Sequence, residues 1–261
     1  MTAIKIEKAT GSGFCFGVRR AIDTLEKVAK DSGSVETLGA VVHNKQVLQR
    51  LAEQGIHVVH SVDEVQGDTL AIGAHGVSPE VEQSIRAHNF TVIDTTCRFV
   101  HRAQMVAKKL AEEDFFVIVF GDVNHPEVKG ILAWAEGKGM ATLDASAVSR
   151  LEPVPHRVGV LSQTTQIPVN FTSFVKGLVD IVYAKDAEIR IIDTICHDIR
   201  RRQTAALELA SRVDLMLVVG DRTSANTNRL VEMCSAVTET HFIETPKIYR
   251  LTGSGVTSIS A

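Results

Sequence analysis

Short apolar runs alternate with longer segments of helical pattern along most of the chain. The apolar runs predict strands over residues 4–6, 35–42, 70–73, 91–94, 115–121, 158–161 and 215–220. The helical patterns predict helices over residues 16–30, 45–54, 78–87, 99–113, 128–135, 171–182, 199–212 and 226–236. Because strands and helices alternate, we expect an α/β protein with parallel sheets that carry helices on both faces.

One phrase occurs twice, each time where a predicted strand leads into a predicted helix. The two copies are Val92-Ile93-Asp94-Thr95-Thr96-Cys97 and Ile191-Ile192-Asp193-Thr194-Ile195-Cys196. Cys15 stands at a similar junction before the first predicted helix. We therefore expect three similar units, 1–96, 97–193 and 194–261, each with one of these cysteines. If the units pack around a pseudo-symmetry axis, the three thiolates converge on one point.

Several predicted strands end at a glycine that is followed at once by a polar loop. In open parallel sheets, ligands bind beyond the carboxyl ends of the strands. These loops supply His43, His75, His125, Glu127, Ser224 and Asn226, and Thr164 follows the strand that ends at Leu161. We therefore expect a binding site made from the strand-end loops.

The composition excludes some classes of function. The chain has 261 residues, of which 44% are hydrophobic and 23% charged, as in ordinary globular proteins. A net charge of -3 gives no overall basic field to favour nucleic acid. The N-terminus has no apolar signal core, and the longest apolar runs are too short to cross a bilayer. We expect a cytoplasmic protein that binds neither nucleic acid nor membrane.

The cysteines point to a metal centre. Their spacing in a chain without a signal peptide favours a ligand or catalytic role over disulfides. Three converging thiolates suggest an iron–sulfur cluster with one iron open to substrate. For each cysteine alone, the alternative is a buried structural thiol. A zinc site fits less well, because structural zinc usually has four protein ligands, often in close cysteine pairs. Cys234 lies on the apolar face of a predicted helix and is expected to pack in the core.

The strand-end residues favour an anionic ligand. Histidine donates hydrogen bonds and, when protonated, holds anionic oxygen. Ser224 and Asn226 stand at a predicted helix start, where free amides and the helix dipole favour phosphate. An ordinary helix cap is the alternative for the latter pair. Together the residues predict a cradle for a diphosphate, although no Walker loop occurs.

Glu127 follows His125-Pro126 beside the same expected cavity. A carboxyl group at this place could deliver a proton, and the Thr164 hydroxyl could position it. The alternative is a first-turn glutamate that complements a helix N-terminus.

An ordered set of motifs covers nearly the whole chain. They are Gly13-Phe14-Cys15-Phe16-Gly17-Val18, Val42-His43-Asn44, Ala74-His75-Gly76, His125-Pro126-Glu127-Val128, Ser162-Gln163-Thr164-Thr165, Asp193-Thr194-Ile195-Cys196 and Ser224-Ala225-Asn226-Thr227-Asn228-Arg229-Leu230. In this order they resemble the 4-hydroxy-3-methylbut-2-enyl diphosphate reductase family, which catalyses the last step of the methylerythritol phosphate route to isoprenoids.

The resemblance implies a fold and a chemistry. The fold would be a trefoil of three α/β units with short parallel sheets around a central [4Fe–4S] cluster, held by Cys15, Cys97 and Cys196. The substrate hydroxyl would bind the fourth iron, and two electrons would convert the allylic diphosphate to isopentenyl and dimethylallyl diphosphate. A ferredoxin or flavodoxin would supply the electrons.

The resemblance also implies roles for the strand-end residues. Those that would hold the diphosphate are His43, His75, Ser224 and Asn226, with Ser260 if one residue is deleted in the alignment. Glu127 would supply protons, assisted by Thr164 and His125.

Three positions depart from the family pattern. Arg98 replaces the usual proline after the second cysteine, Ile199 replaces a threonine, and Ala225 replaces the middle serine of a Ser-Ser-Asn run. A cluster-bearing paralogue that binds a diphosphate or senses redox state without turnover is therefore an alternative. A cluster-free α/β protein that binds a phosphosugar or nucleotide is another.

Overall fold

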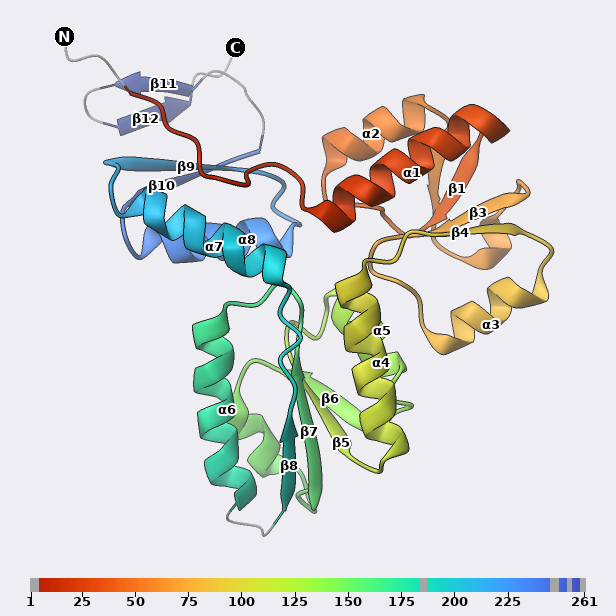
Figure 1. The fold of residues 1–261 in the computed structure, drawn as a ribbon, viewed down its shortest axis with the longest axis vertical. Helices are drawn as coiled ribbons and strands as arrows, with labels where there is room; N and C mark the ends of the chain where they lie inside the picture. Colours follow the sequence, from red (N-terminus) through yellow and green to blue (C-terminus); the bar gives the residue numbers. More distant parts are fainter. Residues whose placement is uncertain (1–4, 184–186, 245–248, 253–254, 259–261) are drawn as a thin grey trace.

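Three bodies of helices and strands meet at the centre of the molecule (Figure 1). The computed structural model describes residues 5–183, 187–244, 249–252 and 255–258. Each body has its own parallel sheet. The predicted trefoil of α/β units with short parallel sheets is confirmed.

The first sheet has four parallel strands in the order β2-β1-β3-β4. Its elements are α1 (Phe16–Ser32), β1 (Val35–Leu38), α2 (Lys45–Glu53), β2 (Ile56–Val59), the 3-10 helix η1 (Val62–Glu64), β3 (Thr69–Ile72), α3 (Pro79–Ala87) and β4 (Thr91–Asp94). Side chains alternate across β3: Ala71 packs with α1 and α2, while Leu70 and Ile72 pack with α3. Both faces of the sheet are therefore covered by helices.

The second sheet repeats this topology with the order β6-β5-β7-β8. Its elements are α4 (Arg98–Glu112), β5 (Phe116–Phe120), α5 (Pro126–Ala133), β6 (Gly139–Thr142), η2 (Ala145–Arg150), β7 (Arg157–Ser162), α6 (Pro168–Tyr183) and β8 (Glu188–Ile191). In β5, Val117 and Val119 pack with α4 and α5, while Ile118 and Phe120 pack with α6. This strand is apolar throughout because it is buried on both faces.

The third body is smaller. It contains α7 (His197–Ala210), β9 (Leu215–Val219), α8 (Ala225–Ser235) and β10 (Glu239–Ile243), with β10 parallel to β9. Strands β11 (Tyr249–Thr252) and β12 (Gly255–Ser258) form an antiparallel pair. The N-terminal segment runs along this body (Figure 1): Ala9 packs on the α7 and α8 cluster, and Glu7 pairs with Arg212 at 3.3 Å.

The element order repeats from body to body. In each body, a helix that begins directly after a cysteine leads into the first strand of the parallel sheet (β1, β5 or β9), and a second helix and a parallel neighbouring strand follow. The first two bodies then add two strands and a helix. The unit boundaries 1–96, 97–193 and 194–261 stay a prediction.

The repeated Asp-Thr-x-Cys phrase is a strand-end turn. Asp94 Oδ1 accepts the amide of Thr96 at 2.8 Å, and Asp193 Oδ1 accepts the amide of Ile195 at 3.0 Å. An aspartate that binds the backbone two residues onward stabilises a tight turn. This turn directs the chain from strands β4 and β8 into helices α4 and α7.

The threonine of the phrase ties its turn to the neighbouring strand. The buried Thr95 hydroxyl donates to the carbonyl of Ile72, while Thr194 Oγ1 accepts the Ser162 amide at 2.9 Å and donates to the Ser162 carbonyl. The cysteine amides then donate to the next loops, Cys97 to Ala74 O and Cys196 to Thr164 O, both at 3.0 Å. The phrase therefore holds two cysteines against the loops that carry His75 and Thr164.

Most predicted elements are present, with shifted ends. The strand predicted over residues 35–42 stops at Leu38, because Gly39 turns the chain at a φ of 75°. The helix predicted over residues 128–135 begins two residues earlier, at Pro126, whose fixed φ suits the first helical turn. The strand predicted over residues 4–6 is wrong at Lys5 and Ile6, which pair with no strand; Ile4 lies outside the described residues.

Six strands were not predicted: β2, β6, β8, β10, β11 and β12. The first four each lie at the edge of a parallel sheet and pair on one side only, and β11 pairs only with β12. Edge strands are partly exposed and mix polar with apolar residues, as in the Glu188–Ile191 strand, so their apolar runs are short.

We expect Thr194→Val to destabilise the fold, since it keeps the side-chain shape but strips the Ser162 amide and carbonyl of a buried partner. Each unsatisfied buried group costs about 1–3 kcal/mol. Denaturant unfolding would measure the loss. Thr172→Val is the control, because Thr172 is exposed on α6, and its free energy of unfolding should change by less than about 0.5 kcal/mol. Equal stability of the two variants would contradict a structural role for Thr194.

Candidate functional site

The three predicted cysteine ligands cap the three helices that start at the centre of the molecule. Cys15, Cys97 and Cys196 are the N-cap residues of α1, α4 and α7, and the starts of these helices converge in Figure 1. Cys15 Sγ accepts the Val18 amide at 3.5 Å. A helix N-terminus stabilises negative charge through its free amides and its dipole. Three such termini together favour an anionic, thiolate-bound group.

The thiols of different bodies are near neighbours. A methyl group at Gly17 would lie 2.8 Å from Cys97 Sγ and 4.0 Å from Cys15 Sγ, so only glycine fits between them. Burial raises the pKa of the Cys97 and Cys196 thiols, and the neighbouring cysteines raise it further. Deprotonation at these positions therefore needs a compensating positive charge, which a bound metal supplies.

The number of thiols argues against a structural zinc ion. One cysteine from each body stands here, whereas structural zinc usually has four protein ligands, often in close cysteine pairs. Three thiols from separate bodies therefore fit an iron–sulfur cluster with one open iron better than a structural zinc ion.

Cys234 lies elsewhere. It is fully buried in α8, where it packs against α7 and β9. The prediction that Cys234 belongs to the core is confirmed.

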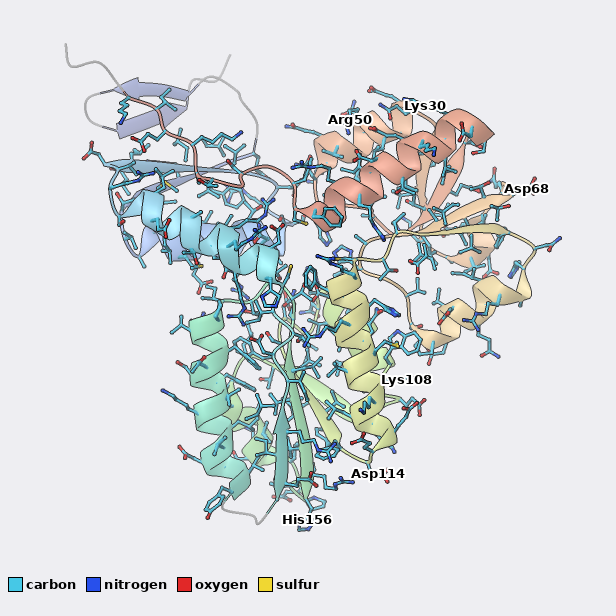
Figure 2. All side chains as sticks on the ribbon, in the orientation of Figure 1. Lys30, Arg50, Asp68, Lys108, Asp114 and His156 are labelled. Atoms are coloured by element: carbon cyan, nitrogen blue, oxygen red, sulfur yellow. The ribbon has the colours of Figure 1, made fainter. Side chains whose placement is uncertain are left out.

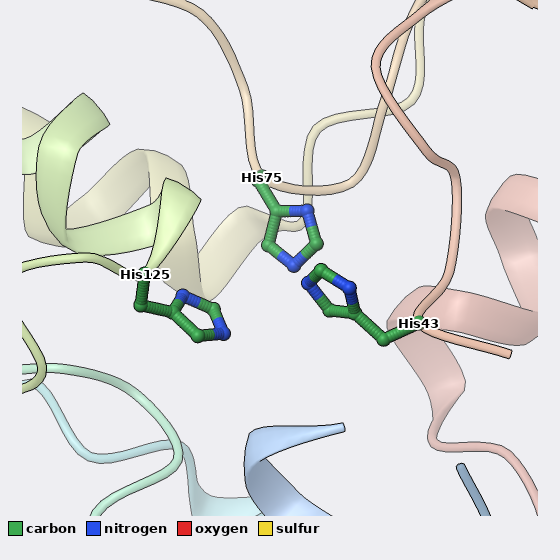
Figure 3. A group of neighbouring side chains, drawn as sticks. All are labelled: His43, His75 and His125. Atoms are coloured by element: carbon green, nitrogen blue, oxygen red, sulfur yellow. The ribbon is translucent and has the colours of Figure 1, made fainter. Parts of the chain in front are cut away.

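Three histidines lie together beside the cysteine site. The ring centroids of His43 and His75 are 4.7 Å apart, and His125 lies 5.4 and 5.6 Å from them. Figure 3 shows the three rings turned toward one another from separate loops. The Nε2 atoms of His43 and His125 are buried and have no hydrogen-bond partner among the described residues. A buried polar atom without a partner points to a ligand that would supply one.

These loops occupy equivalent places in the three bodies. His43, His125 and Ser224 follow strands β1, β5 and β9 and precede helices α2, α5 and α8. His75 and Thr164 follow the equivalent strands β3 and β7. The loops after β1, β5 and β9 are therefore related by approximate three-fold symmetry, and each body contributes the carboxyl end of the first strand of its parallel sheet, as the strand-end glycines predict.

The histidines are neutral at physiological pH. Burial lowers the pKa of His75 to about 3, with further lowering by His43 and His125. Burial also lowers the pKa of His125 to about 4, again with a contribution from His43. For His43, burial lowers the pKa while Asp221 raises it. An anionic ligand would reverse these shifts, because it would stabilise the imidazolium form.

His125 has a defined tautomer. Its Nδ1 accepts the Glu127 amide at 3.1 Å, so the proton of the neutral ring is on the unpartnered Nε2. The ring is therefore held as a donor toward the shared cavity.

Glu127 is a buried carboxyl group that pairs with no cationic side chain among the described residues. Its Oε1 accepts the Thr164 amide at 2.6 Å, and its Oε2 lies 2.9 Å from Thr164 Oγ1. Burial raises the pKa of Glu127 to about 7, against the lowering effect of the Thr164 hydrogen bonds. The side chain is 2% exposed, and its charge raises the pKa of Cys97. Glu127 therefore stands close to the cysteine site and can hold or release a proton near neutral pH.

The start of helix α8 closes the site from the third body. Ser224 is its N-cap and accepts the Thr227 amide at 3.3 Å. The Asn226 Oδ1 atom is buried and has no partner among the described residues. The charge of Asp221 raises the pKa of His43, and the charge of Arg229 lowers the pKa of His125. This end of the third body therefore lies near the histidines. The structure thus brings together all the predicted site residues that it describes; Ser260 lies outside the described residues.

Sequence reasoning missed one residue that shapes the site, Asp221. Its Oδ2 accepts the Lys45 amide at 3.0 Å and so ties the third body to the loop of His43. Burial alone would raise the pKa of Asp221, but hydrogen bonds from Thr223 and Lys45 lower it to about 2. Asp221 directly follows the glycine at the end of β9, and this strand-end position was the available signal.

The structure shows what surrounds two of the residues that depart from the family pattern. The Arg98 guanidinium lies over the rings of Phe16 and Phe99, at 5.5 and 4.9 Å from their centroids. Ile199 is buried in the first turn of α7. Neither substitution displaces the cysteines from the helix starts.

No helix in the described ranges is long and apolar enough to cross a membrane.

Comparisons with known proteins agree with this geometry. A relative from Dehalococcoides mccartyi (strain CBDB1), named 4-hydroxy-3-methylbut-2-enyl diphosphate reductase, is 56% identical over 242 residues, which are 93% of this chain and 85% of the relative. A relative of the same name from Geobacter metallireducens is 40% identical over 244 residues, with 93% of this chain and 84% of the relative covered.

A solved structure of (E)-4-hydroxy-3-methyl-but-2-enyl diphosphate reductase, described as the terminal enzyme of the non-mevalonate pathway, has the same fold. It superposes with a TM-score of 0.70 at 34% identity and covers 95% of this chain and 89% of its own. These names confirm the prediction of an oxidoreductase. A family model described as LytB protein matches residues 6–258. By sequence over nearly all of its length, and by fold, the chain belongs to the LytB protein family.

Proposed function

We propose that this protein reduces 4-hydroxy-3-methylbut-2-enyl diphosphate to isopentenyl and dimethylallyl diphosphate, with electrons from a ferredoxin or flavodoxin. The observation that carries the proposal is the meeting of three helix-capping cysteines with a buried carboxyl group and unpartnered histidines. The names of the relatives, which act on this diphosphate, support it. The same proposal places the enzyme in the cytoplasm, where free thiols stay reduced.

In this proposal Cys15, Cys97 and Cys196 hold a [4Fe–4S] cluster. The three donor sulfurs and the helix N-termini at which they stand fit such an anionic group. When bound, the cluster would supply single electrons and a Lewis-acidic iron near the substrate hydroxyl. The residues around it would bind, orient and protonate the substrate.

The histidines and the start of α8 would bind the diphosphate. His125 would present its Nε2–H, while His43 and His75 would gain protons as the anion enters and then donate from both ring nitrogens. Ser224 and Asn226 would add side-chain contacts next to the free amides of α8. A charge-assisted hydrogen bond of this kind is worth about 1.5–3 kcal/mol. The diphosphate would thus orient the allylic alcohol toward Glu127 and the cysteines.

Glu127 would deliver a proton. Overall, the C–O bond breaks, a C–H bond forms, and two electrons and two protons are consumed: one proton leaves with the hydroxyl as water, and one ends on carbon. A carboxyl group with a pKa of about 7 is half protonated at neutral pH. Because Thr164 Oγ1 lies 2.9 Å from Glu127 Oε2, its hydroxyl can pass the proton toward the substrate.

Serine at Cys15, Cys97 or Cys196 is expected to remove the broad absorption at roughly 400 nm of anaerobically prepared protein, where thiolate-bound clusters absorb. The Cys234→Ser variant is the matched control and should keep the spectrum, because Cys234 packs in the core. Paramagnetic resonance of the reduced protein would identify the cluster type. If Cys234→Ser lost the absorption as fully as the others, the ligand assignment would be wrong.

Diphosphate binding should take up protons and tighten as the pH falls. The reason is that the histidine pKa values lie below 6.5 in the empty site and rise toward or above it next to the anion. Calorimetry of substrate binding in buffers of different ionisation enthalpy would count the protons. His43→Ala should weaken binding roughly ten- to a hundredfold and reduce the proton uptake. His156→Ala should do neither, because His156 is exposed at the end of the second body away from the centre of the molecule (Figure 2). Affinity independent of pH from 6 to 8 would rule out this linkage.

Glu127→Gln should lower turnover by about 10²–10⁴, because glutamine keeps the shape and accepts from the Thr164 amide but has no proton to give. Wild-type turnover should decline above pH 7, where Glu127 loses its proton. The residual turnover of the Glu127→Gln variant should show no such decline. Cluster absorption and substrate affinity should change little. If Glu127 only complements the start of α5, turnover persists and stability falls by about 1 kcal/mol or less. Near-wild-type turnover would therefore exclude proton delivery by Glu127 and leave the helix role.

A further inference from the structure

The first turns of α1 and α4 form an exposed surface directly beside two of the cysteines. Phe16, which follows Cys15, is 62% exposed. A small hollow next to it is lined by Phe16, Gly17, Arg20, Cys97, Arg98 and Phe99. This hollow reaches from the surface to a cysteine of the site, while Cys196 is buried.

Positive charge surrounds this hollow. Arg19, Arg20 and Lys27 line an adjoining shallow depression on α1 together with the single acid Asp23, and Arg98 lines the hollow itself. We refer to Phe16, Arg19, Arg20, Lys27 and Arg98 as the basic face. The whole chain has a net charge of -3, so the basic face is a local departure from the overall charge.

No carboxylate among the described residues neutralises these cations through an ion pair. Arg19 and Arg20 donate instead to backbone carbonyls, those of Phe14 and Thr96, both at 3.2 Å. The Arg98 guanidinium stacks on Phe16 and Phe99. The arginines are thus held in place by contacts that leave their charge available to a partner.

We propose that the basic face is the docking surface for an acidic one-electron carrier protein. The inference rests on the proposed reductase function, which needs two electrons from outside for each substrate molecule. A carrier gives them in two successive dockings, and each docking oxidises one carrier molecule by one electron. Electron transfer slows steeply with distance, so the carrier has to reach the point where the cysteine site lies nearest the surface.

Charge and shape favour a protein of this kind. A positive face around an exposed aromatic ring orients an acidic partner during encounter and supplies a small apolar contact at its centre. Weak redox encounters need only such a small interface. The diphosphate does not compete for this surface, because the residues that we assign to its binding are the histidines, Ser224 and Asn226.

The test is stopped-flow reduction of the anaerobic holoprotein by a reduced acidic [2Fe–2S] ferredoxin, with no substrate present. Arg98→Glu should slow the second-order reduction at least tenfold at low ionic strength, and salt should shrink the difference as it screens the charges. Lys27→Glu should act in the same direction although it lies three turns along α1 from Cys15. Arg98→Lys keeps the charge and should restore most of the rate.

Two comparisons separate docking from damage to the cysteine site. Lys109→Glu is the matched control, since Lys109 is exposed on the same helix as Arg98 but about 16 Å further along it; it should leave the rate unchanged. Reduction by dithionite, which needs no docking, should be equal in all variants. If Arg98→Glu and Lys27→Glu reduce as fast as wild type with ferredoxin, or slow dithionite by the same factor, the docking surface is wrong.

This readout is independent of turnover. A holoprotein that accepts electrons from ferredoxin in the expected charge-dependent way, yet does not convert the allylic diphosphate, would refute the proposed function and leave the docking surface standing.

Discussion

The convergence of three helix N-termini is the constraint on which the rest of the structure depends. Each body starts a helix at a cysteine, and the helices direct their free amides and dipoles to one place. Without a bound anionic group such a meeting would be unfavourable, because like ends of three dipoles would face one another. The geometry therefore favours negative charge at the centre, where the three cysteine thiols stand.

Hydrogen bonds in the turns before these helices hold the cysteines in position. In both copies of the Asp-Thr-x-Cys phrase, aspartate closes the turn, threonine binds the neighbouring strand, and the cysteine amide donates to the next strand-end loop. These hydrogen bonds link the cysteine position to the loops of His75 and Thr164. A shift of either cysteine would thus move the adjoining loop as well. The repeated phrase carries a structural role in addition to the sulfur ligand.

Burial sets the protonation state of both the histidines and Glu127 within the site. Burial keeps the histidines neutral and Glu127 partly protonated in the absence of ligand. An arriving anion favours protonated histidines, while Glu127 keeps a proton that it can give away. In surroundings of low polarity, an Nε2 atom without a hydrogen-bond partner is unfavourable. The same surroundings strengthen the hydrogen bond that this atom would make to a ligand. The neutral ground state is therefore suited to binding an anion and to protonating a carbon centre.

The sequence alone determined the features that depend on interactions between residues close together in the chain. Alternating apolar runs and helical segments identified the central strands and most helices, and glycines at strand ends marked where His43, His75, His125 and Asn226 would stand. The Asp-Thr-x-Cys repeat placed cysteines at helix starts, because turn and capping preferences act over a few residues. The resemblance to a reductase family depended on the same short motifs.

Only the tertiary structure decided which of these pieces meet. Edge strands such as β8 are stabilised by pairing with a distant partner and have weak local signals. The N-terminal segment lacks the predicted strand because it packs along the third body, a long-range contact at Ala9 and Glu7. Burial of Glu127, the tie from Asp221 to the Lys45 amide, and the fit of Gly17 between two thiols all join residues from different loops or bodies. Local sequence fixes the conformation of each segment, whereas protonation states and the shape of the site arise from packing between segments far apart in the chain.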